Sequence, residues 1–207
     1  MAIILEKGGD THRINLEKRE NKSLAGEIII NLDWNKGGFF KGLFGKAVDL
    51  DLGCFYELRN GQKSLIDGLQ FSHGRGGDRQ GCYDNEPYIW HQGDDRGGGS
   101  SSGEVILVNP TGVNEIKRII VYTFIYEGVA KWSETNAIIK IKVPGYEDVV
   151  VEMGQQFSNK KFCAIAELNF GSDNSITVKK LVTFHDGHSG CDKQYGWGFN
   201  YSPGSKD

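Results

Sequence analysis

The chain has 207 residues, of which 38% are hydrophobic and 11% aromatic, so it can form one large domain or two small ones with a real core. Its formal net charge of −3 gives no basic surface of the kind that binds nucleic acid. No apolar run approaches the roughly 18 residues needed to span a bilayer. The N-terminus, MAIILEKGGDTHR, lacks the apolar core of a signal peptide, and we therefore expect a cytoplasmic protein.

Glycine is the outlier of the composition, because 29 of the 207 residues are glycine, about twice the usual share of roughly 7%. Proline is rare, with four residues, which argues against disorder as the explanation. We expect the glycines to serve tight turns and close approaches of the backbone. The four cysteines lie far apart without a C-x-x-C pair, which predicts reduced thiols.

Short runs of β-branched and aromatic residues follow one another along the chain, and none shows a sustained helical period. Turn residues separate them, and Asn60-Gly61 between two alternating runs is typical of a β-hairpin. Regularly spaced strands without intervening helices predict an all-β fold, namely an antiparallel two-sheet β-sandwich with little helix. The expected strands are residues 27–34, 47–58, 103–109, 116–128, 136–143, 148–153, 161–170 and 175–184.

A polar, glycine-rich segment at residues 73–102 interrupts this pattern. It consists mostly of Gly, Asp, Arg, Ser and Gln, broken by PYIW at 87–90. A loop of this length is either disordered or organised for function. A flexible linker between domains has a simpler composition, whereas this segment contains four aspartates, and its PYIW stretch has two large aromatics. We therefore predict a single domain over residues 1–207, with a long acidic loop insert at about 73–102.

The end of this insert has the composition of a calcium-binding loop. Calcium takes six to eight oxygen ligands, which acid-rich loops with glycine supply as carboxylates and carbonyls. Asp94 and Asp95 begin the stretch GDDRGGGSSSGE, and Glu104 ends it where the next strand is expected. A phosphate-binding loop fits less well, because the stretch leads into a strand, lacks Lys and has acids at both ends.

A second acidic pair, Asp49 and Asp51, has the spacing of alternate residues on a strand. Both carboxylates would then face away from Leu50 and Leu52, about 7 Å apart along the strand. Two parallel carboxylates repel each other unless a cation or an arginine lies between them. The alternative is a solvated outer face of the sheet.

The segment FHDGHSGCDKQYGWG near the C-terminus places His185, His188 and Cys191 three residues apart. A zinc site or a Cys–His nucleophile is conceivable. Structural zinc sites normally show a C-x-x-C or H-x-x-x-H half-site, and a turn with hydrogen-bonding histidines is therefore favoured. The stretch YGWGFNY at 195–201 interleaves aromatics with glycine, which suits a closing edge strand over the core.

Five segments in the same order resemble the TerD-domain family of tellurium-resistance and bacterial stress proteins, with the closer match to its TerA-type branch. Together they cover most of the chain. They are ILEKGGDTHRINLEK opening into INLDW, VDLDLGCFYELRNGQ, YDNEPYIWHQGDDRGGG, IKRIIVYTFIYEGVAKWSETNAIIKI and GHSGCDKQYGWGFNYSPGSKD.

The resemblance implies a β-sandwich, calcium bound in acidic loops, and a cytoplasmic role in resistance to tellurite and other stress or in phage defence. TerD-type members carry a second acidic motif, G-D-G-D-D-E, which serines 100–102 replace in this chain. A site with fewer carboxylates binds calcium more weakly. Our leading interpretation is a non-enzymatic calcium-binding module that acts with other tellurium-resistance and stress proteins. The expected ligands are Asp49, Asp51, Asp94, Asp95 and Glu104, with Asp84 compensating for the lost acids.

Two other interpretations stay open. The first is a metal-free scaffold that docks partner proteins or a membrane surface through exposed aromatics, namely Phe39, Phe40, Trp90 and Trp132. The loop NKGGFFKGLFG, which carries the first two, would equally fold back onto its own core. The second is an enzyme built on the C-terminal histidines and Cys191, for which the sequence offers no nucleophile with an identifiable base.

Overall fold

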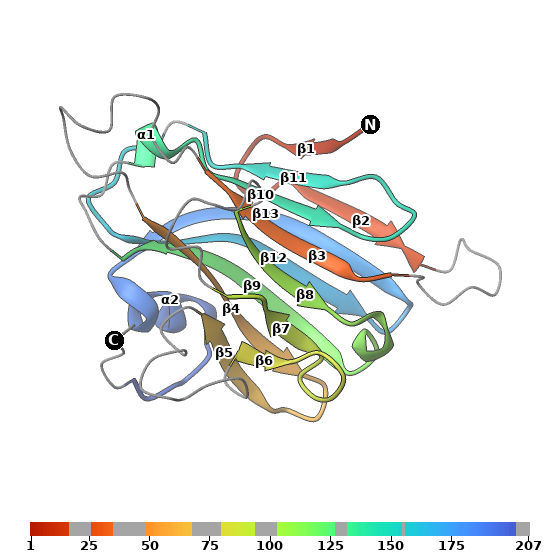
Figure 1. Cartoon of the computed structure of the whole chain (residues 1–207). Helices are drawn as coiled ribbons and strands as arrows, with labels where there is room; N and C mark the ends of the chain where they lie inside the picture. The colour runs from red at the N-terminus through yellow and green to blue at the C-terminus, as the bar shows by residue number, and fades with distance from the viewer. Residues whose placement is uncertain are drawn as a thin grey trace.

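The structure, a computed structural model of the chain, describes residues 1–16, 26–34, 49–67, 80–93, 103–126, 132–154 and 156–201. These residues form two β-sheets that pack face to face, with few and short helices (Figure 1). The expected mostly-β, two-sheet sandwich is therefore confirmed. Within these ranges, no helix is long and apolar enough to cross a membrane.

The first sheet has seven strands and the second has six. In spatial order the first sheet comprises β1 (Ile3–Leu5), β11 (Val149–Glu152), β10 (Ile138–Lys142), β3 (Ile28–Asp33), β8 (Glu104–Val108), β7 (Ile89–His91) and β6 (Gly81–Cys82). The second sheet comprises β2 (Thr11–Asn15), β13 (Ser175–His185), β12 (Phe162–Gly171), β9 (Ile116–Ile125), β4 (Leu50–Leu58) and β5 (Lys63–Asp67). The helical segments are η4 (Pro110–Gly112), α1 (Trp132–Thr135) and α2 (Gly187–Tyr195).

The strand pairing departs from the expected antiparallel arrangement at one edge of the first sheet. There β1 pairs with β11 in parallel, in the register Ile3 with Val149. The two strands are far apart in sequence, so no hairpin constrains their relative direction. The other strand pairs within the described ranges are antiparallel.

Part of the polar insert is ordered into the first sheet. Residues 80–93 carry β6 and β7, and β7 pairs with β8 in the register Trp90 with Leu107. Residues 73–79 and 94–102 of the insert lie outside the described part of the chain. The described part of the insert is therefore a continuation of the sheet.

Both faces of β4 are covered, and all nine of its residues are buried. Leu50 and Leu52 point into the main core between the two sheets. On the opposite face, Phe55 packs in a second apolar cluster that includes Tyr122 of β9 and Trp197 after α2. The C-terminal segment thus forms a third layer over the outer face of the second sheet.

The C-terminal residues differ from the sequence-based expectation. His188 and Cys191 lie in α2, a helix of nine residues, where a turn was expected. Residues 195–201 form no strand, because Gly196 and Gly198 have φ values of 70° and 78°, which an extended strand does not accommodate. Asp192 instead accepts hydrogen bonds from the amides of Gly198 and Phe199, at 2.7 and 2.8 Å. The tail is thereby folded back onto the sheet.

Lys180 joins the two sheets at the edge where β13 approaches β1 and β11. Its Nζ donates to the carbonyl oxygens of Leu5, Glu6 and Glu152, at 3.1, 2.9 and 2.6 Å. These bonds use all three protons of the ammonium group. Burial lowers the pKa of Lys180, although neighbouring carboxylates act in the opposite direction.

We predict that Lys180→Met lowers the free energy of unfolding by about 2 kcal/mol, because three carbonyl groups lose a charged donor. The matched control is Lys179→Met, which changes the neighbouring, half-buried side chain of the same strand and should cost less than about 0.5 kcal/mol. Urea unfolding of both variants measures the difference. Equal loss of stability in the two variants would contradict the assigned role of Lys180.

Candidate functional site

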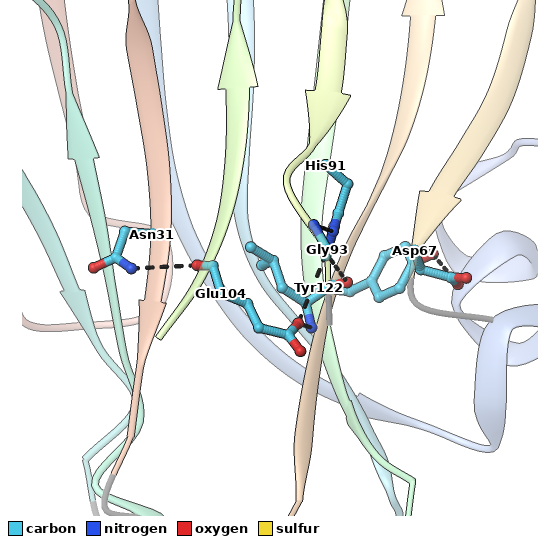
Figure 2. Close-up of polar contacts among 7 residues, drawn as sticks. Asn31, Asp67, His91, Gly93, Glu104 and Tyr122 are labelled. Carbon is cyan, nitrogen blue, oxygen red and sulfur yellow. Dashed lines mark hydrogen bonds and ion pairs between the residues drawn. The ribbon is translucent and has the colours of Figure 1, made fainter. Parts of the chain in front are cut away.

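The first polar site lies where β5 ends beside β4. Leu52 of β4 lies just beyond the end of β5. Its N–H and C=O therefore need partners other than β5, because buried backbone groups are costly to leave unpaired. The Oε2 atom of Glu104 accepts a hydrogen bond from the Leu52 amide at 2.6 Å, and His91 Nε2 lies 3.1 Å from the Leu52 carbonyl oxygen (Figure 2). Glu104 and His91 belong to β8 and β7, so side chains of the first sheet complete the edge of the second.

The protonation of His91 follows from its two contacts. The amide of Gly93 donates to Nδ1 at 3.1 Å, so the proton of the neutral ring lies on Nε2 and is donated to the Leu52 carbonyl. His91 Nε2 also lies 3.7 Å from Glu104 Oε2, so the two side chains meet at this edge.

Two carboxylates at this edge are removed from solvent. The exposed fractions of Asp51 and Glu104 are 0% and 2%. Asp51 faces the outer side of the second sheet, because Leu50 and Leu52 on either side of it point into the main core. A buried carboxylate requires compensation by hydrogen bonds or a cation, since desolvation costs several kcal/mol. The solvated outer face considered for Asp51 is therefore not what the structure shows.

The described residues on either side of residues 94–102 lie at this same edge. The amide of Gln92 donates to the carbonyl of Val105 at 2.9 Å, which holds the two flanks of the segment together. Gly93 precedes Asp94 directly and contacts His91. We call the start of β4 from Asp49 to Leu52, together with the side chains of His91 and Glu104, the Leu52 corner.

The structure separates Asp84 from the Leu52 corner. Asp84 is exposed in the turn before β7. In the same turn, Glu86 Oε1 lies 3.4 Å from the side-chain nitrogen of Asn60, in the hairpin that follows β4. Asp51 is near the other end of β4, about 20 Å away at the rise of a β-strand. Asp84 therefore cannot share an ion with Asp51, and composition alone could not reveal this.

Of the remaining predicted site residues, some are described by the structure and others are not. Asp49 is half-buried before β4, and Trp90 is half-buried in β7. Asp94, Asp95, Phe39 and Phe40 lie outside the described residues. Among the residues that are described, no three His, Cys, Asp or Glu side chains gather closely enough to hold a metal ion.

A second polar site, which the sequence did not indicate, lies on the outer face of the second sheet. Asp67 Oδ2 accepts a hydrogen bond from the Tyr122 hydroxyl at 2.7 Å and lies 2.8 Å from His188 Nε2. Asp67 stands opposite Gly53 on β4. A side chain at position 53 would collide with the Tyr122 ring and with Asp67, which explains the glycine in this buried strand.

Aromatic rings enclose this second site. His188 packs edge-on against Phe162 and Tyr122, with ring centroids 4.8 and 5.3 Å apart. Burial, followed by the proximity of Asp67, raises the pKa of Tyr122, so its hydroxyl stays protonated and donates. The arrangement fastens α2 to β5 and β9 through one shared carboxylate.

The C-terminal histidines and Cys191 do not assemble into a reactive centre. His185 Nε2 is 2.9 Å from Thr183 Oγ1, and His188 contacts Asp67. Burial, and secondarily Asp192, raises the pKa of the Cys191 thiol to about 12. A thiol in that state is a poor nucleophile at neutral pH.

Comparison with known proteins gives a sequence relative and four similar solved chains, two of which are described below. The chain is 38% identical over 199 residues to the tellurium resistance protein TerA of an Alcaligenes species, a match covering 93% of this chain and 56% of that protein. The chain thus spans about half the length of the curated relative it matches. No protein-family model matches the chain.

Both solved structures are similar in fold at low sequence identity. A Streptomyces coelicolor homologue of the telluride resistance protein TerD aligns with a TM-score of 0.52 and 14% identity, over 77% of this chain and 90% of that one. A protein of unknown function aligns with a TM-score of 0.54 and 15% identity, over 80% and 92% of the two chains. At such identities the similarity establishes the fold alone.

We predict that a thiol-reactive dye at pH 8 labels Cys191 only when the protein unfolds, because the side chain is buried and its pKa is about 12. Mass spectrometry of proteolytic fragments, with and without denaturant, locates the label. The half-buried Cys82 is the internal comparison. Rapid labelling of Cys191 in the native protein would contradict this prediction and would support the interpretation of Cys191 as a nucleophile.

We predict that Asp192→Asn lowers the free energy of unfolding by about 2 kcal/mol at pH 7, because the tail loses charge-assisted acceptors. Burial would raise the pKa of Asp192, but the amides of Gly198 and Phe199 and the Tyr201 hydroxyl outweigh it, and the pKa is lowered. A lowered folded-state pKa stabilises the protein above the unfolded value near 3.8, and this stabilisation is lost as pH falls through the folded value.

The difference between wild type and Asp192→Asn should therefore shrink below pH 4, as measured by thermal unfolding across pH. Asp186→Asn is the control, because that carboxylate has an exposed ion pair with Lys160. A difference that is independent of pH would contradict the charge-based explanation.

Proposed function

Because this chain belongs to the family of the tellurium resistance protein TerA, we propose that it acts in tellurite resistance and related stress as a cytoplasmic, calcium-binding, non-enzymatic module. The family assignment predicted from the sequence segments is confirmed by the 38% identity along 93% of the chain. The calcium site, the mode of action and the location in the cell are the proposed parts.

The observation that carries the calcium proposal is the burial of Asp51 and Glu104 at one corner of the sandwich. Calcium prefers carboxylate and carbonyl oxygens, which are the donors at the Leu52 corner. His91 would not be a ligand, because both of its ring nitrogens are engaged with backbone groups. The donor chemistry of the corner therefore fits calcium better than zinc.

The described residues supply only part of a coordination sphere. Asp51 of β4 and Glu104 of β8 provide the buried carboxylates, and Asp49, just before β4, does not join them in a group of three close enough to hold an ion. Asp94 and Asp95 follow Gly93 in the chain, and Gly93 is held at the corner by its bond to His91. We propose that these two aspartates complete the site. A bound divalent cation would supply positive charge to the buried carboxylates and would join the two sheets.

A non-enzymatic role is supported by the chemistry of the reactive side chains. The thiol of Cys191 has a raised pKa, and His188 is committed to Asp67. The proposed partners are other tellurium-resistance and stress proteins. The TerA relative is about twice as long as the region that matches this chain, so it has a further region with which a module of this kind could act. A fold that calcium binding stabilises would present such partners with a defined surface.

We predict that calcium raises the melting temperature of chelator-treated protein, and that calcium at 100 times its dissociation constant adds about 2.7 kcal/mol of stability. Asp51→Asn and Glu104→Gln should each weaken binding at least tenfold by titration calorimetry. Glutamine still has an oxygen to accept the Leu52 amide proton, so this edge should stay intact in Glu104→Gln.

The matched control is Asp84→Asn. This variant removes an exposed carboxylate in the turn before β7 and should leave the calcium affinity unchanged. Wild-type protein that neither binds nor gains stability at millimolar calcium would contradict the proposal. So would an equal loss of affinity in the Asp84 variant.

A further inference from the structure

A pocket of about 560 Å³ opens at the edge of the sandwich that is opposite β5 and β6, where β1 and β11 approach β13. Its volume is in the range of ligand-binding pockets. Its walls combine apolar side chains with an acidic rim. The apolar side chains are Ile4, Leu5, Met153, Leu181 and Val182, and the rim carries Glu6 and Glu152.

A distortion of β13 shapes this pocket. Lys180 pairs with Ala166 of β12 and Thr183 pairs with Ala164, so two residues of β13 oppose one residue of β12, which is a β-bulge. Val182, within the bulge, has a φ of 50°, an unfavourable conformation for a β-branched residue. Such strain costs about 1–3 kcal/mol and is concentrated at functional sites.

The pocket is unsuited to a small anion. Lys180 is its one basic residue among those described, and the carbonyls of Leu5, Glu6 and Glu152 take all three of its ammonium protons. The charges that act on Lys180 are the carboxylates of Glu152, Asp10 and Glu6. The apolar walls and the surplus of negative charge instead favour an apolar group that is followed by basic residues.

The chain itself carries a segment with that chemistry beside the pocket. Phe157 has 87% of its surface exposed, an unusual state for a large aromatic side chain. It follows Gln156, which lines the pocket. Lys160 and Lys161 come three and four residues later. An exposed aromatic side chain thus follows the pocket-lining Gln156 directly in the chain, and of the two lysines after it Lys160 is paired with Asp186 whereas Lys161 is exposed.

We propose that this face binds a second copy of the chain, with Phe157 of each copy inserted into the pocket of the other. A two-fold symmetric interface uses the same patch on both subunits, so the anchor must lie close to its receptor, and Phe157 is next in the chain to Gln156 of the pocket wall. Buried aromatic anchors dominate the binding energy of many interfaces. Ile4, 53% exposed on the edge strand β1, adds apolar surface to the same patch.

The lysines and glutamates of the patch give the dimer its charge complementarity. Lys161, which is exposed, would approach the acidic rim of the other copy near Glu152. This inference does not depend on calcium, because the pocket lies at the opposite edge of the two sheets from β5, whose end marks the Leu52 corner.

Sedimentation equilibrium from about 1 µM to 1 mM tests the proposal, and the upper limit reaches interactions as weak as a millimolar dissociation constant. Wild type is expected to dimerise, and Phe157→Ser should weaken the dimer at least tenfold. The control is Asn159→Ser, an exposed position in the same segment, which should leave dimerisation unchanged. Circular dichroism melts confirm that each variant remains folded.

A charge exchange provides a second measurement. Glu152→Lys should weaken the dimer, and Glu152→Lys combined with Lys161→Glu in the same chain should restore it. Wild type that stays monomeric at 1 mM would overturn the proposal. A dimer that Phe157→Ser leaves intact, or a double variant no tighter than Glu152→Lys alone, would also overturn it.

Discussion

The buried backbone edge of β4 at Leu52, just beyond the end of β5, is the constraint on which the proposed site depends. β5 ends at Asp67, so the amide and carbonyl of Leu52 take partners from the other sheet, and these are Glu104 and His91. Meeting this requirement places one carboxylate deep in the protein. It also brings the end of β7 and the start of β8 to the same corner, because these two strands carry those two side chains.

The third layer of the fold shields the outer face of this corner from solvent. Helix α2 and the tail after it cover the outer face of the second sheet, so Asp51 points into a buried region. The hydrogen bonds of Asp67 with Tyr122 and His188 hold this layer in place. A carboxylate in such surroundings interacts strongly with a nearby cation, because the local dielectric response is weak. The structural role of α2 and the proposed calcium site are thus physically linked.

Much of the fold could be predicted because strand patterns and turn residues act locally. Each of the eight expected strands corresponds to an observed strand whose ends differ by at most a few residues. For example, the strand expected at 175–184 is observed at Ser175–His185. Strands β1, β2, β5, β6 and β7 lie outside the expected ranges, and three of them, β1, β6 and β7, have only two or three residues, which carry no periodicity. Helix α2 was missed because GHSGCDKQY has low helix propensity, and contacts such as that of His188 with Asp67 stabilise it instead.

The calcium site stays a prediction. Asp51 and Glu104 are buried, which the sequence pattern did not indicate, and Asp84 is exposed in the turn before β7. His91 and Asp67 were not singled out, because their partners are distant in sequence. Composition indicates which ligand a loop suits, but only the strand order shows which acids meet.

The most direct measurement is an amide-resolved NMR titration of chelator-treated protein with calcium. The Leu52 amide is the reporter, because it donates to Glu104 Oε2 at 2.6 Å and responds when that carboxylate binds a cation. The account predicts large, saturable shifts at Leu52 and Gly93, with no change at Asp84 in the turn before β7. Shifts that are absent from Leu52, or that centre on the turn around Asp84, would contradict the calcium site at this corner.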